Sequence, residues 1–148
     1  HLKKYRNHNI KIYAPLSYGD FQYAQKVISK GQEIFGNKFI GITEFLEKDK
    51  YLEFLNSIDI AIFNHNRQQA MGNTITLLSM GKTIYLRPGT TQWHFFQQKN
   101  IKVFDVNHIN LNTSVNLSEN ITIVTQYFSY DNYYQQWRSI FLNQEKHE

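Results

Sequence analysis

The sequence has no cysteine and only two prolines among its 148 residues. Without cysteine, neither a disulfide framework nor a thiolate metal site is possible. No apolar run approaches the ~20 residues that a membrane-spanning helix needs, and no signal peptide is visible. The chain begins with His1 rather than Met, followed by the basic segment LKKYR, and we therefore expect a fragment of a longer protein.

Several signatures of known chemistry are also missing. There is no G-x-G-x-x-G dinucleotide fingerprint and no G-x-S-x-G nucleophile elbow. The six histidines have no metal-ligand spacing, and no D-x-D pair is present. The tripeptide GKT at 81–83 leaves a helix-like run and enters a strand-like run, the reverse of the order in a phosphate loop. We therefore expect a protein that uses neither a metal ion nor a cofactor.

The composition is that of a folded protein. Hydrophobic residues make up 41% and aromatic residues 16% of the chain, and a chain of this length buries roughly 70% of its unfolded surface. We expect a single domain over residues 1–148, without repeats or linkers. The formal charge of +4 fits an anionic small ligand, an acidic lipid surface or RNA, and does not decide among them.

Strand-like and helix-like segments alternate about five times with short connections. Strands are expected within 9–18, 38–46, 58–64, 82–87 and 101–106, and helices within 20–36, 49–57, 72–81 and 91–100. Asp49 is expected to cap the second of these helices. The strand at 58–64 is almost continuously apolar, as in strands covered on both faces. Residues 107–120 read as a loop, and 118–148 as C-terminal helices. This order predicts an α/β fold, a Rossmann-like parallel sheet with helices on both faces.

Nine residues at 64–72, between an apolar strand and a helix, are almost all polar or small. A helix that starts near Gly72, Asn73 and Thr74 offers free backbone N–H groups to an anion, and Asn73 or Thr74 can cap it. Arg67 adds a bidentate cation for phosphate oxygens. Side chains able to bind sugar hydroxyls or an acetamido group are those of His65, Asn66, Gln68 and Gln69.

The alternative is that Asn73 or Thr74 only caps the helix and Arg67 pairs with a surface acid. Six consecutive polar side chains after a buried strand have no packing explanation, which favours a binding site.

Other loops after strands carry weaker signals. Ser17, Tyr18 and Gly19 can direct N–H groups into the same crevice, or form an ordinary turn in which Asp20 caps the next helix. Glu44, after the second strand, can hold a base or ribose, or simply lie in a surface loop. The segment 93–96 is expected in the core, and Thr90, Thr91 and Gln92 could line the crevice. The aromatic stretch 127–141 is expected to pack onto the sheet or onto a partner domain.

Four pieces of the chain are similar to a known family. They are PLSYGD, the long segment YLEFLNSIDIAIFNHNRQQAMGNTITLLSMGKTIYLR, TTQW and VFD. The pattern resembles the donor-binding half of glycosyltransferases with the GT-B fold. More closely, it resembles the bacterial 4-alpha-L-fucosyltransferases, the TDP-N-acetylfucosamine:lipid II N-acetylfucosaminyltransferases of enterobacterial common antigen synthesis. The similar region runs from about Ile10 to Asp105.

The resemblance implies a metal-independent glycosyltransferase that moves 4-acetamido-4,6-dideoxy-galactose from a TDP donor to a polyprenyl-diphosphate-linked acceptor. It implies a peripheral protein on the cytoplasmic face of the inner membrane, of which this chain is the C-terminal, donor-binding half. On its own this half would be inactive, with the catalytic base in the other half.

By the same resemblance, the first donor loop is Ser17, Tyr18 and Gly19, and the diphosphate site is Arg67, Gly72, Asn73 and Thr74. Contacts to the sugar or phosphate come from Asn64, His65, Asn66, Gln68 and Gln69. Many such enzymes have a glutamate in the polar loop that binds the donor ribose or sugar. Gln68 and Gln69 stand near that position here, and Glu44 is a possible substitute for the missing glutamate.

Two other functions remain open from the residues alone. One is a non-catalytic α/β module that binds a nucleotide or phosphosugar. The other is an RNA-binding or anionic-lipid-binding domain, suggested by the sequence pI near 9.2 and the basic start. The basic residues are scattered rather than gathered on one predicted face, so we expect no nucleic-acid partner.

Overall fold

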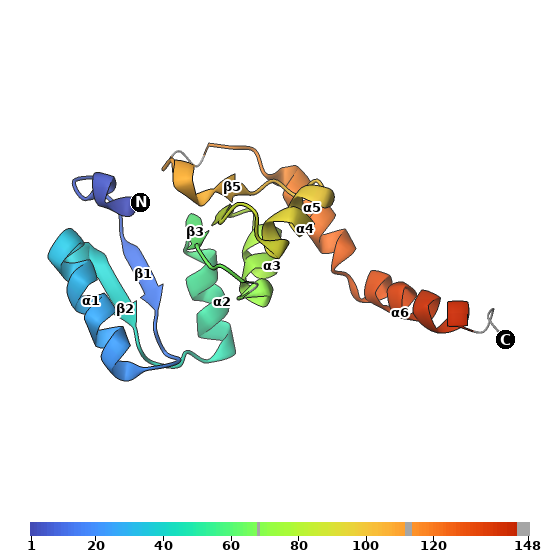
Figure 1. The fold of residues 1–148 in the computed structure, drawn as a ribbon, viewed down its shortest axis with the longest axis horizontal. Coiled ribbons are helices and arrows are strands. Elements are labelled where there is room, and N and C mark those ends of the chain that lie inside the picture. The colour runs from blue at the N-terminus through green and yellow to red at the C-terminus, as the bar shows by residue number, and fades with distance from the viewer. Residues whose placement is uncertain (68, 112–113, 145–148) are drawn as a thin grey trace. The chain divides into compact units, whose positions relative to one another are not determined.

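A computed structural model describes residues 1–67, 69–111 and 114–144. Strands and helices alternate in these residues in the expected order (Figure 1). The strands are β1 (Ile12–Pro15), β2 (Phe39–Ile42), β3 (Ile60–Phe63), β4 (Thr83–Leu86) and β5 (Phe104–Asp105). The α-helices are α1 (Phe21–Phe35), α2 (Lys48–Asn56), α3 (Met71–Ser79), α4 (Thr91–Gln98), α5 (Ser118–Tyr127) and α6 (Tyr130–Gln144). Short 3-10 helices are η1 (Leu2–Tyr5), η2 (Gly36–Lys38) and η3 (Val106–His108).

Each strand pairing in the described residues is parallel, and helices flank the strands, so the predicted α/β class with a Rossmann-like pattern is confirmed. The strands are divided between a two-stranded sheet, β1-β2, and a three-stranded sheet, β3-β4-β5, where the sequence led us to expect one sheet. Each sheet belongs to its own compact unit, residues 1–54 and 55–148. We describe each unit by itself, and the assignment of 1–148 to a single domain stays a prediction.

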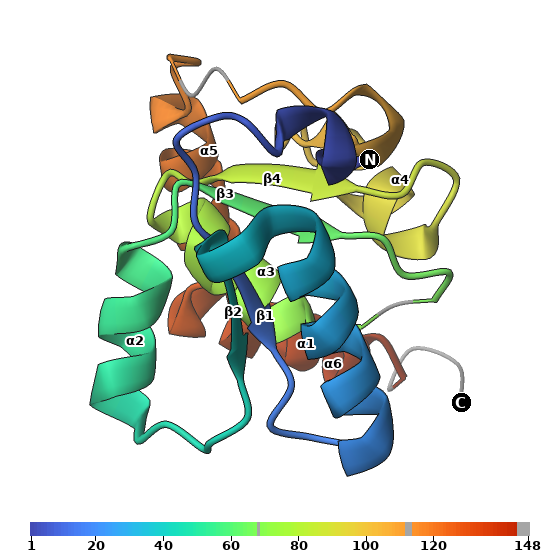
Figure 2. The ribbon, with the colours of Figure 1, turned by 90° about the vertical axis from the view of Figure 1, so that its left-hand side faces the viewer.

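In the first unit, α1 runs along the β1-β2 sheet (Figure 2). Two glycines allow this close approach. A Cβ on Gly31 would collide with the ring of Phe39, and a Cβ on Gly41 would lie 2.5 Å from Ile28. Ala24 is buried. The helix therefore packs on the sheet through small residues, and its backbone comes near the strands.

In the second unit, β4 is buried at each of its four positions, with α3 packed against it and against α5. Among the described residues, the largest fully buried side chains all come from this unit: Phe96, Leu78, Ile84, Leu86, Ile101, Val106, Val124 and Thr74. The core position expected for Phe96 is confirmed, whereas its neighbour His94 is exposed. β3 forms an edge of its sheet and is half-buried at each of its four positions, so the full burial expected on both faces is not seen.

The two C-terminal helices expected after residue 118 are present as α5 and α6. Tyr127 and Phe128, at the end of α5, pack their rings on Phe95 of α4, with centroids 5.8 and 6.1 Å apart. The large apolar side chains described on α6 are exposed instead. The beginning of the aromatic stretch thus packs within this unit, and packing of α6 onto a partner domain stays a prediction.

Two expected boundaries differ in detail. Asp49 lies inside the first turn of α2 and is not its cap, because the helix begins one residue earlier and the Tyr51 N–H donates to the Glu47 carbonyl. The fifth strand is only two residues long. The end of α3 is as expected: Gly81 has a φ of +72°, and its N–H donates to the Leu78 carbonyl, which terminates the helix.

Candidate functional site

The strands of the second unit end level with one another. Phe63, the last residue of β3, pairs with Leu86, the last of β4, and Leu86 pairs with Asp105, the last of β5. The loops 64–70 and 87–90 and the helix η3 therefore begin at one edge of the sheet. In parallel α/β sheets, ligands bind at this carboxyl edge.

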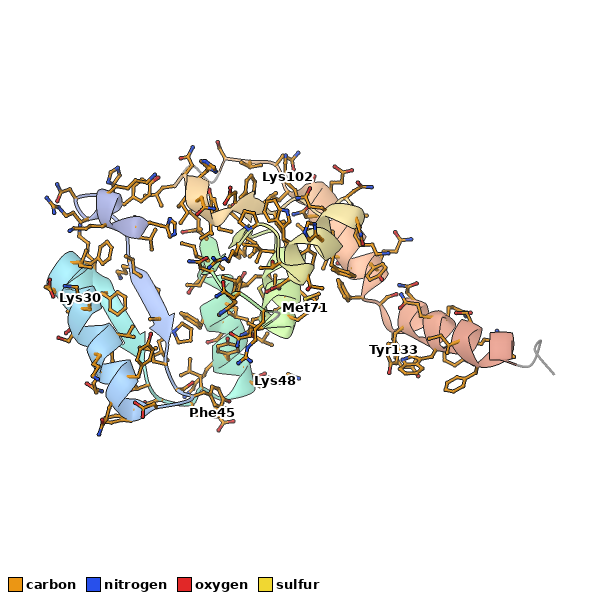
Figure 3. The ribbon with its side chains drawn as sticks, viewed as in Figure 1. Lys30, Phe45, Lys48, Met71, Lys102 and Tyr133 are labelled. Carbon is orange, nitrogen blue, oxygen red and sulfur yellow. The ribbon has the colours of Figure 1, made fainter. Side chains whose placement is uncertain are left out.

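The start of α3 is a set of backbone donors without a side-chain cap. Ala70 takes a left-handed conformation, with φ 53° and ψ 33°, and α3 follows from Met71 (Figure 3). The first helical hydrogen bond runs from the Thr74 N–H to the Ala70 carbonyl, at 2.9 Å. The N–H groups of Met71, Gly72 and Asn73 precede that bond and have no carbonyl one turn earlier in the helix. They form the positive end of the helix dipole.

This start corrects the sequence prediction about capping. Neither Asn73 nor Thr74 caps the helix, because the left-handed turn at Ala70 begins it earlier and places both residues in its first turn. Gly72 is exposed there, and a Cβ added to it would have no atom within 4 Å. Open space thus lies directly beside these N–H groups, for which the described residues offer no hydrogen-bond partner.

A buried hydrogen-bond pair holds the start of α3 against the start of α4. Thr74 has no exposed surface, and Gln92 is 5% exposed. The Thr74 hydroxyl donates to the Ala70 carbonyl at 2.9 Å and accepts from Gln92 Nε2 at 3.0 Å. Breaking such a buried pair costs about 1–3 kcal/mol, so this contact makes the two loop ends rigid relative to each other. The sequence analysis placed Gln92 near the crevice, but it did not predict the hydrogen bond to Thr74.

Most of the described side chains between β3 and α3 face water. Asn64, Asn66, Arg67 and Gln69 are exposed, and the half-buried His65 ring lies 6.1 Å from that of Phe63. Within the described residues, Arg67 has no hydrogen bond or ion pair, so the alternative in which it pairs with a surface acid finds no support there. Gln68 lies outside the described residues.

The remaining predicted residues lie in the first unit, on the loops after β1 and β2. Tyr18 is 81% exposed, and its ring meets that of Phe45 edge-on, with centroids 6.5 Å apart. Gly19 has a φ of +93°, and Glu44 is exposed. Asp20 caps α1 by accepting from the Tyr23 N–H at 2.5 Å, as in the ordinary-turn alternative. The structure brings the two loops of this unit together, and their joining with residues 64–74 into one site stays a prediction. Ser17 is half-buried between β1 and this turn.

A carboxylate–imidazole pair at the end of β5 was missed by the sequence analysis. Asp105 Oδ2 lies 2.9 Å from His108 Nδ1, and Asp105 Oδ1 accepts from the Asn107 N–H at 2.7 Å. The backbone hydrogen bond from Asn107, aided by His108, lowers the pKa of Asp105. The signal in the sequence was the i, i+3 spacing of an acid and a histidine directly after a strand.

Among the residues described, no three or more His, Asp or Glu side chains gather where they could hold a metal ion. None of the described helices has both the length and the apolarity to cross a membrane. Neither finding tests the expectation that catalysis needs no metal or cofactor.

Parallel strands with a polar loop and an uncapped helix start at their carboxyl edge define an α/β protein with a Rossmann-like pattern. Comparison with curated proteins and with solved structures finds no match. A family model, described as 4-alpha-L-fucosyltransferase, glycosyl transferase group 56, matches residues 1–146. The chain therefore belongs to the 4-alpha-L-fucosyltransferase family, and the resemblance inferred from its sequence is confirmed. Members of such a family are glycosyltransferases, which act on a sugar donor and an acceptor.

Proposed function

We propose that the protein transfers 4-acetamido-4,6-dideoxy-galactose from a TDP-sugar to a polyprenyl-diphosphate-linked acceptor, and that this chain supplies the donor-binding half with the GT-B fold. The family supports the transfer of a sugar. The observation that carries the donor-binding role is the start of α3, where first-turn N–H groups with no partner among the described residues stand beside the open space at Gly72.

The donor diphosphate binds at this helix start. Its phosphate oxygens accept from the N–H groups of Gly72 and Asn73, and the guanidinium of Arg67 donates to them from the exposed loop. When the bond between the anomeric carbon and the phosphate breaks, negative charge grows on those oxygens. Donors already aimed at that position stabilise the charge without reorganising. The buried Thr74–Gln92 pair keeps them in place.

Positive charge from the helix dipole and Arg67 does the work that a divalent cation does in other sugar-nucleotide enzymes, so the transfer is proposed to be independent of metal. The side chains of Asn64, His65, Asn66 and Gln69 hydrogen-bond the donor sugar and ribose. Ser17, Tyr18, Gly19 and Glu44 form the second group of donor contacts, and Gln68 belongs with the first. The acceptor and the location on the inner membrane rest on the family resemblance alone.

The experiment compares Arg67→Ala with Arg138→Ala in the intact enzyme. Arg138 is an exposed arginine of α6, so its loss changes the charge equally. We expect Arg67→Ala to lower kcat/KM for the TDP-sugar on the order of 10²-fold, as removal of one charge-stabilising donor does, and Arg138→Ala to leave it unchanged. Near-normal turnover by Arg67→Ala contradicts the assigned role.

Calorimetry with TDP, UDP and GDP tests the donor base. Selective binding of TDP supports the proposal. Binding of TDP without transfer to any lipid-linked saccharide would instead favour a non-catalytic nucleotide-binding or phosphosugar-binding module. Binding of RNA or anionic vesicles that falls steeply with salt and ignores nucleotides would contradict both.

A further inference from the structure

The pair formed by Asp105 and His108 lies at the same sheet edge as the proposed donor site. Asp105 is the last residue of β5 and is paired with Leu86, which is paired with Phe63 of β3. Neighbouring strands lie about 4.8 Å apart, so Asp105 stands about 10 Å across the sheet from the strand that enters the polar loop. Both strand ends therefore border the same ligand-binding edge.

Both oxygens of the Asp105 carboxylate have a partner, which fixes the geometry of the pair. Oδ1 of Asp105 accepts from the Asn107 N–H, and Oδ2 lies 2.9 Å from Nδ1 of His108. The carboxylate is 27% exposed, whereas the imidazole is 82% exposed. A capping turn accounts for Asp105 and the Asn107 N–H, but it does not require an imidazole at position 108.

The geometry selects one tautomer of the imidazole. Since a carboxylate only accepts, Nδ1 of His108 must carry the proton, and the lone pair of a neutral ring is then on Nε2. A carboxylate behind an imidazole also stabilises the imidazolium that forms when Nε2 takes up a proton. The exposure of the ring leaves Nε2 accessible to a substrate.

We propose that His108, positioned by Asp105, accepts the proton of the acceptor hydroxyl during sugar transfer, an inference that rests on the proposed function. It places the catalytic base in this chain, whereas the family resemblance led us to expect it in the other half. The acceptor oxygen forms its bond to the anomeric carbon as the bond from that carbon to the donor phosphate breaks. The nucleoside diphosphate leaves with the electron pair. The hydroxyl proton passes to Nε2 of His108 and then to water, so atoms and charges balance.

Other ionisable residues belong to the neighbouring strand ends, and Arg87, which directly follows Leu86, is an exposed one. Tyr85, on the neighbouring strand β4, uses its hydroxyl to donate to and accept from the backbone of Asn110. Lys102, two residues before β5, is exposed and donates its backbone N–H to Asn120. Within the described residues, the pKa of Asp105 is lowered first by the backbone hydrogen bond from Asn107 and then by the charge and hydrogen bond of His108.

The test uses three variants of the intact enzyme: His108→Gln, Asp105→Asn and His94→Gln. Glutamine at 108 removes the proton acceptor from an exposed position. Asparagine at 105 can still accept from the Asn107 N–H, so it keeps the turn but removes the carboxylate. His94 is an exposed histidine of α4 and serves as the matched control. Each variant is measured for TDP affinity by calorimetry, for kcat, and for kcat/KM against pH.

We expect His108→Gln to lower kcat about 10²- to 10⁴-fold, the usual contribution of a general base, with TDP affinity unchanged. The acid limb of the pH profile should disappear in this variant. In Asp105→Asn, kcat should fall while TDP affinity is kept, since the imidazole loses the carboxylate that fixes its tautomer. A purely structural role of His108 would not remove the acid limb. His94→Gln should behave as wild type.

Three results would overturn the inference. One is a His108→Gln enzyme with normal kcat. A second is loss of TDP affinity that accounts for the whole defect, which would make His108 a donor-binding residue. A third is an acid limb that survives unchanged in His108→Gln. Each can occur while the wild type transfers the sugar normally, so it leaves the proposed function standing. A wild type without transfer activity overturns both.

Discussion

Replacement of Gly72 by alanine separates ligand binding from protein stability at the start of α3. In the structure, the added Cβ meets no atom within 4 Å, and Gly72 does not have a positive φ. Alanine therefore fits without strain. It should stabilise the fold by about 0.4–1 kcal/mol, because glycine loses more backbone entropy on folding.

The same methyl group should weaken donor binding. Every Cα–Cβ bond of an α-helix tilts toward the N-terminus, so the methyl enters the space that a diphosphate oxygen needs when it accepts from the first-turn N–H groups. A loss of tenfold to a hundredfold in TDP affinity corresponds to about 1.4–2.8 kcal/mol. The sign of the binding change is thus opposite to the sign of the stability change.

The assay combines thermal unfolding with calorimetric titration of TDP, for the wild type and Gly72→Ala. Thr125→Ala is the control, since Thr125 is exposed on α5 and alanine there also favours the helix. It should stabilise the protein and leave TDP binding intact. A Gly72→Ala protein that is more stable and binds TDP as well as the wild type would refute the diphosphate site at this helix start.

Three further substitutions test the packing around the site. Thr74→Val should lower the free energy of unfolding by about 1–3 kcal/mol, because Gln92 loses its buried acceptor; a denaturant titration in which Thr74→Val is as stable as wild type would contradict the rigid link. Phe96→Ala should cost about 3–5 kcal/mol as a fully buried ring, whereas Trp137→Ala, exposed on α6, should stay within about 0.5 kcal/mol. If the two alanine variants unfold at similar denaturant concentrations, this assignment of the core is wrong. Gly41→Ala should cost about 1–3 kcal/mol by pushing α1 off its sheet, and an unchanged melting temperature would count against that close contact.

Local patterns predicted much of the fold. Short apolar segments, alternating or continuous, located each strand, and the helix after β4 was expected at 91–100. Its cap was not predicted: the Thr90 hydroxyl accepts from the Trp93 N–H. Predictions that depended on neighbours failed more often. The burial of β3 and the exposure of α6 both depend on which parts of the structure pack against them. A local sequence pattern does not contain this information.

For the candidate site, the sequence alone determined which residues follow β3 and that a helix begins near Gly72, because chain order and period are local properties. The tertiary structure decided the left-handed turn at Ala70 that begins the helix and the contact of Thr74 with Gln92. It also decided that β5 ends level with β3, which places Asp105 at the same edge. The latter two features join segments far apart in the chain, and the loss of chain entropy in bringing them together is offset only by the whole packed core.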